Sequence, residues 1–483
     1  MSHLRIPSHR RMSSTESADA AGARPWLLLF LMSAAQFMVV LDITVVNVAL
    51  PSIGRSLRFA SADLQWVVSA YVLVTGGLTL LGGRAADLLG RRRIFLAGLA
   101  LFTTASLASG LAPDAGALVA ARAAQGIGAA LLTPAALAII TAAYSGAQRA
   151  TALSVWGALA AGGSAVGLLA GGMLTTWLGW RWVFLINVPI GLITALLSAH
   201  LVPAAAPADD RRNLDLAGAL LLVAGIGTAV YAITGVARYG WGSARTLLLL
   251  ALAAGLLAAF GVTEGRVRAP LVPPRALRSR FLVTGALTML TGTGLLIGVL
   301  FLSSLYLQNV LHASPIRTGL EFLPLVLTTG AGAHLSARYI RRAGSRLLAV
   351  AGLVAMAAGA LVLSQVNGYP DGLLPGFLLL GSGAGLVFPA ASVTAMHTVA
   401  RDEAGLAAGI VTTGHEVGAA LGVAVFATLA AATTGFAAAG PASATAFRHV
   451  FAIGAVIAAG LAVIAALTVP PVRPAAEVRV GMH

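Results

Sequence analysis

Long runs of apolar residues, separated by short polar gaps, make up most of the chain. A helix of about 20 apolar residues crosses a hydrocarbon core of roughly 30 Å, so runs of this length indicate membrane-spanning helices. The pattern predicts about fourteen of them. They cover residues 26–50, 64–83, 94–112, 115–143, 151–177, 182–202, 214–236, 246–263, 281–307, 316–337, 347–366, 372–396, 405–432 and 449–469. The fold class expected is therefore an all-α polytopic membrane protein.

The longest polar gaps, 203–213 and 264–280, divide the predicted helices into groups of six, two and six. Such a division is typical of transporters built from two parallel repeats. A weak internal repeat agrees with it, since Gly and several Arg follow the second helix of each six-helix group, at Gly83–Arg93 and Gly332–Arg346. We expect an N-terminal six-helix bundle at 26–202, a linker with two additional transmembrane helices at 203–280, and a C-terminal six-helix bundle at 281–470.

The distribution of arginine predicts which ends of the helices face the cytoplasm. All 31 basic residues are Arg, and the net charge is +15. Cytoplasmic loops of membrane proteins are enriched in positive charge, and with the N-terminus inside, about 23 arginines fall on the inner side against about 7 outside. The protein is expected to be multi-pass in the cytoplasmic (inner) membrane, with cytoplasmic tails at 1–25 and 471–483. The first apolar run is too long for a signal peptide, so we expect the N-terminal tail to be retained.

Composition argues against several classes of function. With 58% hydrophobic and 10% charged residues, the chain differs from soluble domains, in which about a quarter of residues are charged. The absence of Cys excludes disulfides and cysteine nucleophiles, and the absence of Lys excludes an ATP-binding P-loop. The arginines lie between apolar runs rather than on one face, which argues against nucleic acid as a partner. No grouping of His, Asp and Glu has metal-ligand spacing, so we expect no metal, no cofactor and no enzymatic activity.

Asp42 and Arg122 are charged residues inside predicted membrane helices. Holding a charge there costs roughly 2.5–3.5 kcal/mol, so such residues usually face the bundle interior or a watery cavity and mark ion or proton pathways. At 1.5 Å per residue, Asp42 lies about 12 Å and Arg122 about 10 Å from the outer ends of their helices. We predict that the two side chains face each other or share water and take part in proton coupling. A static buried ion pair is the alternative.

Two further acids are candidates for proton coupling. Glu416 lies near the middle of the thirteenth predicted helix beside His415, and Glu321 lies about five residues into the tenth. Glu416 is the stronger candidate, because an interfacial role at the outer rim is equally expected for Glu321. The predicted substrate cavity is lined by Gln36, Asp42, Asn47, Trp66, Tyr71, Gln125 and Glu416.

The loop between the second and third predicted helices combines an acid with several arginines. Such a cluster can pair across helices in one conformation and separate in another, which would make it a conformational latch. Anchoring by the positive-inside rule alone is the other interpretation. The residues expected to form the latch are Gly83, Asp87, Gly90, Arg91 and Arg92.

Glycines recur along the fifth predicted helix. Gly163, Gly167 and Gly171 follow one another at four-residue steps, with Gly172 alongside. Small residues at this spacing let helix backbones approach closely, and glycine also permits bending. Tight packing is the first interpretation, and a flexible gating helix is compatible with it.

Several of these segments, taken in order, resemble the major facilitator superfamily, and specifically its fourteen-helix drug:proton antiporter branch. The similarity covers nearly the whole chain. It rests on Leu41–Pro51 in the first helix, Gln65–Tyr71 at the start of the second, the Gly83–Arg93 loop, Arg122–Gly128 in the fourth, and the glycine-rich fifth helix with Trp180–Pro189 after it. The chain departs from the family's patterns at Leu168, where the fifth-helix signature of exporters has Pro, and at Ala85 and Leu88, where the loop usually has Leu and Arg.

The resemblance implies export of a small amphipathic drug, antibiotic or organic cation, driven by protons that move inward. Alternating access would arise as the two halves rock about a cavity near the midplane. The implied partners are a small-molecule substrate, protons and the lipid bilayer, with a monomer as the expected oligomeric state. A proton-coupled importer of the same fold is the main alternative. A membrane enzyme or a passive assembly subunit is disfavoured, because no nucleophile, catalytic base or metal cluster is visible.

Overall fold

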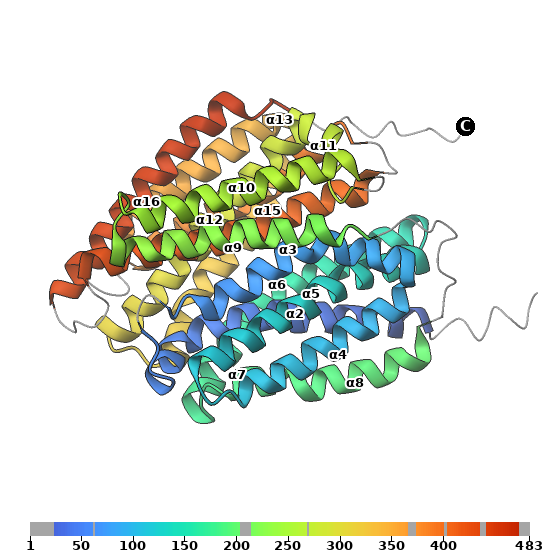
Figure 1. The fold of residues 1–483 in the computed structure, drawn as a ribbon, viewed down its shortest axis with the longest axis horizontal. Helices are drawn as coiled ribbons and strands as arrows, with labels where there is room; N and C mark the ends of the chain where they lie inside the picture. Colours follow the sequence, from blue (N-terminus) through green and yellow to red (C-terminus); the bar gives the residue numbers. More distant parts are fainter. Residues whose placement is uncertain are drawn as a thin grey trace, which may run out of the picture.

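The computed structural model describes residues 24–60, 63–202, 214–267, 270–365, 373–399, 403–434 and 441–472, and these form an all-helical bundle (Figure 1). Most of the two predicted tails and the gap 203–213 lie outside the described residues. The helices are α2 (Arg24–Ser56), α3 (Trp66–Leu89), α4 (Arg91–Gly110), α5 (Ala115–Ala143), α6 (Gly146–Trp177), α7 (Trp182–Leu185), α8 (Asn187–Leu201), α9 (Leu216–Tyr239), α10 (Ala244–Arg266), α11 (Pro274–Arg278), α12 (Arg280–Leu305), the π-helical turn η1 (Tyr306–Val310), α13 (Pro315–Leu363), α14 (Leu373–Met396), α15 (Ala404–Thr434) and α16 (Pro441–Thr468).

A helix lies over each of the fourteen predicted ranges. Among the described residues, twelve helices are long and apolar enough to cross a membrane. One of them, α13, has 49 residues and turns at Gly344, whose φ of 79° is not helical, so it consists of two rods. Besides these twelve, the 32-residue α6 covers the predicted range 151–177.

Several boundaries differ from those predicted, and two of the differences have a clear cause. Helix α2 continues through Pro51 to Ser56, because a proline late in a helix removes one backbone hydrogen bond without preventing another turn. The predicted helix 182–202 is divided at Ile186 into the short α7 and the longer α8. Asn187 is therefore the first residue of α8, and Pro189 falls in its first turn, where proline is tolerated.

The helices before residue 203 pack mainly on one another, as do α12 to α16. Helix α9 lies against both groups, since Gln65, just before α3, donates to Thr234 at 2.7 Å and Thr428 of α15 donates to the carbonyl of Ile233 at 3.0 Å. Helix α10 packs on α9 and is mostly exposed (Figure 1). We refer below to the first bundle (α2 to α8), the second bundle (α12 to α16) and the inserted pair (α9 and α10).

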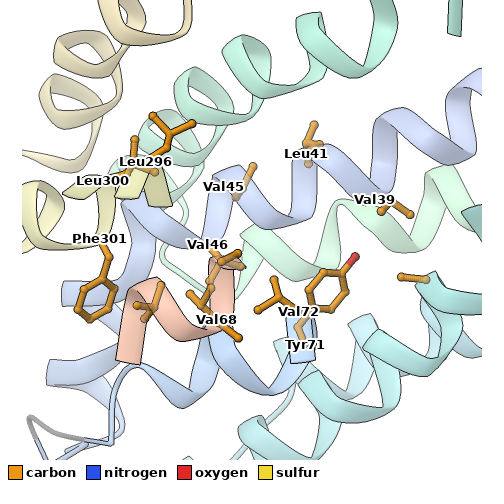
Figure 2. Packing of buried hydrophobic residues seen from close by; sticks show 14 of the residues in the cluster. Val39, Leu41, Val45, Val46, Val68, Tyr71, Val72, Leu296, Leu300 and Phe301 are labelled. Atoms are coloured by element: carbon orange, nitrogen blue, oxygen red, sulfur yellow. The ribbon is translucent and has the colours of Figure 1, made fainter. Parts of the chain in front are cut away.

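One hydrophobic core runs through both bundles. Near the middle of α2, Val45 and Val46 belong to the same buried cluster as Val68 of α3, and Figure 2 shows Leu300 and Phe301 of α12 close by. These side chains are all buried, with at most 4% of the surface of any one exposed. The apolar contact between α2 and α12 therefore joins the two bundles directly.

The two bundles repeat one structural detail at the starts of their third helices. Gly90, with φ 99°, precedes α4, and Gly344, with φ 79°, precedes the second rod of α13. Two residues after each glycine is an arginine that donates to a carbonyl at the end of the sixth helix of its own bundle: Arg92 to Ala199, and Arg346 to Val469 at 2.5 Å. The weak sequence repeat thus corresponds to a repeated contact between helix ends.

Candidate functional site

A polar cluster lies inside the first bundle around Asp42 of α2, which is fully buried. Arg122 of α5 donates from Nη1 to Asp42 Oδ2 at 2.5 Å. The other carboxylate oxygen, Oδ1, accepts from Gln125 Nε2 at 2.8 Å and from Asn187 Nδ2 at 3.1 Å. Both oxygens of the carboxylate are therefore bound, and the arginine predicted to face Asp42 is in contact with it.

Arg122 contacts four residues besides Asp42. Its Nε atom donates to the carbonyl of Val67 on α3 at 2.9 Å, and Nη1 also donates to Gln125 Oε1 at 2.7 Å. Its guanidinium carbon lies 4.3 Å from the ring centroid of Tyr71 and 5.6 Å from that of Phe184, distances at which a cation is attracted to an aromatic face. The arginine thus ties α2, α3 and α5 together.

Ser106 of α4 is a further member of the cluster. Its hydroxyl accepts from Gln125 at 3.2 Å and from Asn187 at 3.0 Å, and donates to the carbonyl of Phe184 at 2.9 Å. Ser106 and Asn187 were not among the predicted site residues. The only signal for Asn187 in the sequence is that a polar amide interrupts an apolar run.

The chemistry of this cluster depends on charge balance. A buried ion pair is stable only if its remaining hydrogen-bonding groups are satisfied, and removing one partner leaves an uncompensated charge. Adding a proton to Asp42 would remove half of the pair and weaken the contact that joins α2 to α5. The arrangement can therefore convert proton binding into a change in how α2 is held.

Glu416 of α15 lies near Tyr71 and Gly76 of α3. The electrostatic surroundings of the buried Tyr71 hydroxyl include Asp42, Arg122 and Glu416. Glu416 packs against Gly76 of α3, where a Cβ atom would lie 2.6 Å from Glu416 Cβ, and its Oε1 is 3.5 Å from His415 Nδ1. The acid predicted in the second bundle thus adjoins α3, although no described hydrogen bond connects it to Asp42.

Glu321 has a different environment from the other two acids. It is 6% exposed, and its Oε1 accepts from Arg317 Nε, one turn earlier on α13, at 2.7 Å. The arginine side chain is 60% exposed, so this pair lies at the edge of the bundle. The structure does not bring Glu321 into the Asp42 cluster.

The remaining predicted cavity residues divide into two groups. Gln36 and Asn47 lie on α2, and each has a buried side-chain oxygen without a hydrogen-bond donor among the described residues. Trp66 instead packs on Tyr231 of α9, with ring centroids 6.3 Å apart, away from the cluster. Its backbone neighbour Val67, rather than Trp66 itself, contacts Arg122.

The end of α2 that arginine counting places outside is joined to the second bundle. Ser304 donates to the carbonyl of Asn47, and Gln308 donates to that of Val48, both at 2.8 Å. Nearby, the backbone N–H of Ile316 donates to Thr176 Oγ1 at the end of α6 at 3.2 Å. We call these three contacts the outer seal. They begin only five residues beyond Asp42 on the same helix.

The predicted latch is positioned by the first bundle alone. Asp87 Oδ1 lies 3.6 Å from Arg91 Nη2, with the Asp87 side chain exposed and that of Arg91 partly buried, and Arg91 also donates to the carbonyl of Ala138 on α5 at 3.4 Å. Arg92 is bound to α8. No described ion pair links the latch to the second bundle.

The glycines of α6 pack as the four-residue spacing predicts. Gly163, Gly167 and Gly171 face α2, and a Cβ atom on Gly171 would lie 2.9 Å from the backbone of Val45. Gly172 faces the second bundle instead, where its Cβ would lie 2.7 Å from Ile316 Cα. One face of α6 is thus fitted to α2, and the adjacent face takes part in the outer seal.

The sequence profile of the Major Facilitator Superfamily matches residues 32–423 and 300–481 of the chain. The chain is 44% identical over 433 residues to the puromycin resistance protein pur8 of Streptomyces alboniger, covering 87% of this chain and 85% of that protein. It is 39% identical over 435 residues to the cephamycin export protein CmcT of Amycolatopsis lactamdurans, covering 88% and 87%. It is 38% identical over 434 residues to a lincomycin resistance protein of Streptomyces lincolnensis, covering 86% and 87%.

Solved structures agree in fold. A bacterial homologue of the lysosomal transporter Spinster, in an inward-facing conformation, superposes with a TM-score of 0.67 at 17% identity, covering 93% of this chain and 98% of that one. The inward-open xylose transporter XylE of E. coli superposes with a TM-score of 0.62 at 14% identity, covering 93% and 97%. At these identities the likeness shows a common architecture alone.

Proposed function

The chain belongs to the major facilitator superfamily, and on that premise we propose that it is a proton-coupled antiporter that exports small amphipathic drugs, antibiotics or organic cations across the cytoplasmic membrane by alternating access. The export direction is supported by relatives named for resistance to, or export of, puromycin, cephamycin and lincomycin. The observation that carries the proton coupling is the buried ion pair between Asp42 and Arg122.

In the proposed cycle, a proton from outside binds Asp42 and neutralises its carboxylate. Arg122 then loses its counter-charge but keeps its contacts with Val67 and Gln125, so α2 is the helix that loses a contact. Helix α2 also carries two acceptors of the outer seal, so a shift of α2 would weaken these contacts and favour separation of the outer ends of the bundles. Release of the proton to the cytoplasm restores the ion pair. Proton binding and opening are thus connected through one helix.

Glu416 is proposed as the acid that the second bundle contributes. It lies on α15 against α3, between the two bundles, where it can attract a cationic substrate or hold a second proton. Among the described residues no group of three or more His, Cys, Asp and Glu side chains could hold a metal, and the mechanism proposed needs no cofactor.

The test is transport in everted membrane vesicles with an acidic lumen, using puromycin and lincomycin as probes. Addition of a transported probe should release protons from the lumen, and Asp42→Asn should abolish that release while the protein is still inserted. Asp63→Asn, at an exposed position, serves as the matched control. Proton release that persists in Asp42→Asn would move the coupling site elsewhere. Higher rather than lower drug accumulation in cells that express the protein would indicate an importer.

A further inference from the structure

Two buried acids meet at the predicted cytoplasmic ends of the inserted pair. Asp215 precedes the first turn of α9, and Glu264 lies in the last turn of α10. They are 7% and 2% exposed, respectively. Helices α9 and α10 lie side by side, so residues 49 positions apart in the sequence come together (Figure 1). Neither residue belongs to the Asp42 cluster.

Each carboxyl group has one oxygen that accepts a backbone hydrogen bond. Asp215 Oδ1 accepts from the N–H of Gly218 at 2.7 Å and so caps α9. Glu264 accepts through Oε2 from the N–H of Val272 at 2.8 Å and so holds the turn between α10 and α11. The other two oxygens, Asp215 Oδ2 and Glu264 Oε1, are buried and have no donor in the part of the chain that the structure describes.

These two free oxygens lie close together beside Gly218. A Cβ atom on this glycine would lie 2.6 Å from Asp215 Oδ2 and 2.7 Å from Glu264 Oε1, so the two oxygens are at most 5.3 Å apart, in space that the absence of a side chain leaves open. Ionised carboxylates only accept hydrogen bonds, so neither could supply the hydrogen if both were charged.

Among the described residues, no cation is paired with either of these two carboxyl groups. The apolar cluster beside the pair contains Ala219, Phe260, Leu271 and Val272, with Leu80 of α3 and Ile410 of α15 packed on it. Among the described residues at this end of the adjoining elements, the charged side chains are Arg84 and Asp87 of α3, Arg266 of α10, Arg275 and Arg278 of α11, and Glu403 just before α15. None of these forms an ion pair with Asp215 or Glu264 among the described contacts.

We propose that Asp215 and Glu264 form a second proton-binding site, in which one carboxyl group is protonated and donates its hydrogen to the other. Two carboxylates this close cannot both ionise in apolar surroundings, because like charges repel and burial disfavours the charged form. One proton removes the repulsion and satisfies both free oxygens. The site joins the start of α9 to the end of α10, and α9 in turn contacts both bundles. This proposal does not depend on the transport function proposed above.

The direct test is the infrared C=O stretch of a protonated carboxyl group, measured on the full-length protein in lipid nanodiscs. The measurement uses an Asp42→Asn/Glu416→Gln background, so that the acids of the transport site do not contribute. A protonated-carboxyl band should be present at neutral pH and disappear at high pH. Asp215→Asn and Glu264→Gln should each remove it. A band that is unchanged in both variants, or is absent from the parent, would overturn the proposal.

Unfolding of the otherwise native protein provides a second readout. A shared proton is lost as the pH rises, so the midpoint of thermal unfolding should fall toward high pH. In Asp215→Asn the amide donates to Glu264 at every pH, so this decline should disappear. Asp114→Asn is the matched control, because Asp114 caps α5 in the same way, through the N–H of Ala117 at 2.8 Å, but is exposed. An equal decline with pH in Asp215→Asn and in the native protein would contradict the shared proton.

Discussion

Arg122 reaches from α5 to α2 so that its Nη1 atom lies 2.5 Å from Asp42 Oδ2, while its Nε atom is bound to the carbonyl of Val67 on α3. Both side chains are at most 1% exposed. One arginine therefore joins three helices of the first bundle, and its charge is balanced by a single acid. The stability of the bundle and the protonation of Asp42 are consequently linked through this pair.

We expect the stabilities of Asp42 and Arg122 variants to be strongly non-additive. Asp42→Asn or Arg122→Gln alone should destabilise the protein by about 3–5 kcal/mol, because each leaves a buried charge unpaired. The double variant should be less destabilised than the sum of the two, with a coupling of about 0.5–3 kcal/mol. The measurement is denaturant unfolding in detergent micelles. Additive effects would mean that the two charges do not interact in the folded protein.

Ser106 should stabilise the site although it does not touch Asp42. In Ser106→Ala, Gln125 and Asn187 lose a shared acceptor and the carbonyl of Phe184 loses a donor. Buried groups left unsatisfied cost about 1–3 kcal/mol each, so a loss of that order is expected in unfolding measurements. Thr104→Ala, on the exposed side of the same helix, is the control and should stay within about 0.5 kcal/mol of the native protein. Equal effects would show that the hydroxyl of Ser106 contributes nothing specific.

Much of the fold could be predicted because the lipid bilayer imposes a simple length rule on apolar segments. The same rule made Asp42 and Arg122 visible, since a charge within a span needs a partner and these two lie at matching depths. The pairing of Glu321 with Arg317 was not predicted, because Arg317 lies at the helix start, where a charge can be solvated and does not require a partner. Ser106 was not selected because small polar residues are common in membrane helices, and Asn187 was not selected because the sequence does not show which partner its amide has. Only the packing of α4 and α8 shows that they converge on one carboxylate.

Glycine at position 171 should be required for the packing of α6 on α2. In Gly171→Ala, the new Cβ would lie 2.9 Å from the backbone of Val45, closer than real contacts allow, so the helices must separate. A lower midpoint of thermal unfolding is expected. Gly162→Ala is the matched control on the same helix, because nothing lies within 4 Å of a Cβ atom there. If the two variants unfold alike, the close approach of α6 to α2 is not important for stability.

Gly344 should resist substitution because of its backbone conformation. Its φ of 79° and ψ of 159° lie in a region that essentially only glycine adopts, where a side chain costs roughly 1–3 kcal/mol. Gly344→Ala should therefore unfold at lower denaturant concentration, with loss of the contact between Arg346 and Val469 that follows the turn. Gly330→Ala, in the helical part of α13 with open space around it, should have little effect. Comparable stability of the two variants would show that the turn tolerates a side chain.

The outer seal must open if α2 and α6 take part in alternating access, and the absence of native cysteine allows this to be tested without background labelling. Thr176 Oγ1 accepts from the backbone of Ile316 across the two bundles. In the Thr176→Cys/Ile316→Cys variant, a short thiol crosslinker should therefore join the bundles and stop export of a transported drug from cells or vesicles. A cleavable form of the crosslinker should restore transport after reduction.

Each single substitution, treated in the same way, should retain activity, which separates the effect of the link from that of modification. Export that continues at the full rate in the linked protein would show that these helix ends stay together throughout the cycle, and opening would then have to be sought elsewhere between the bundles.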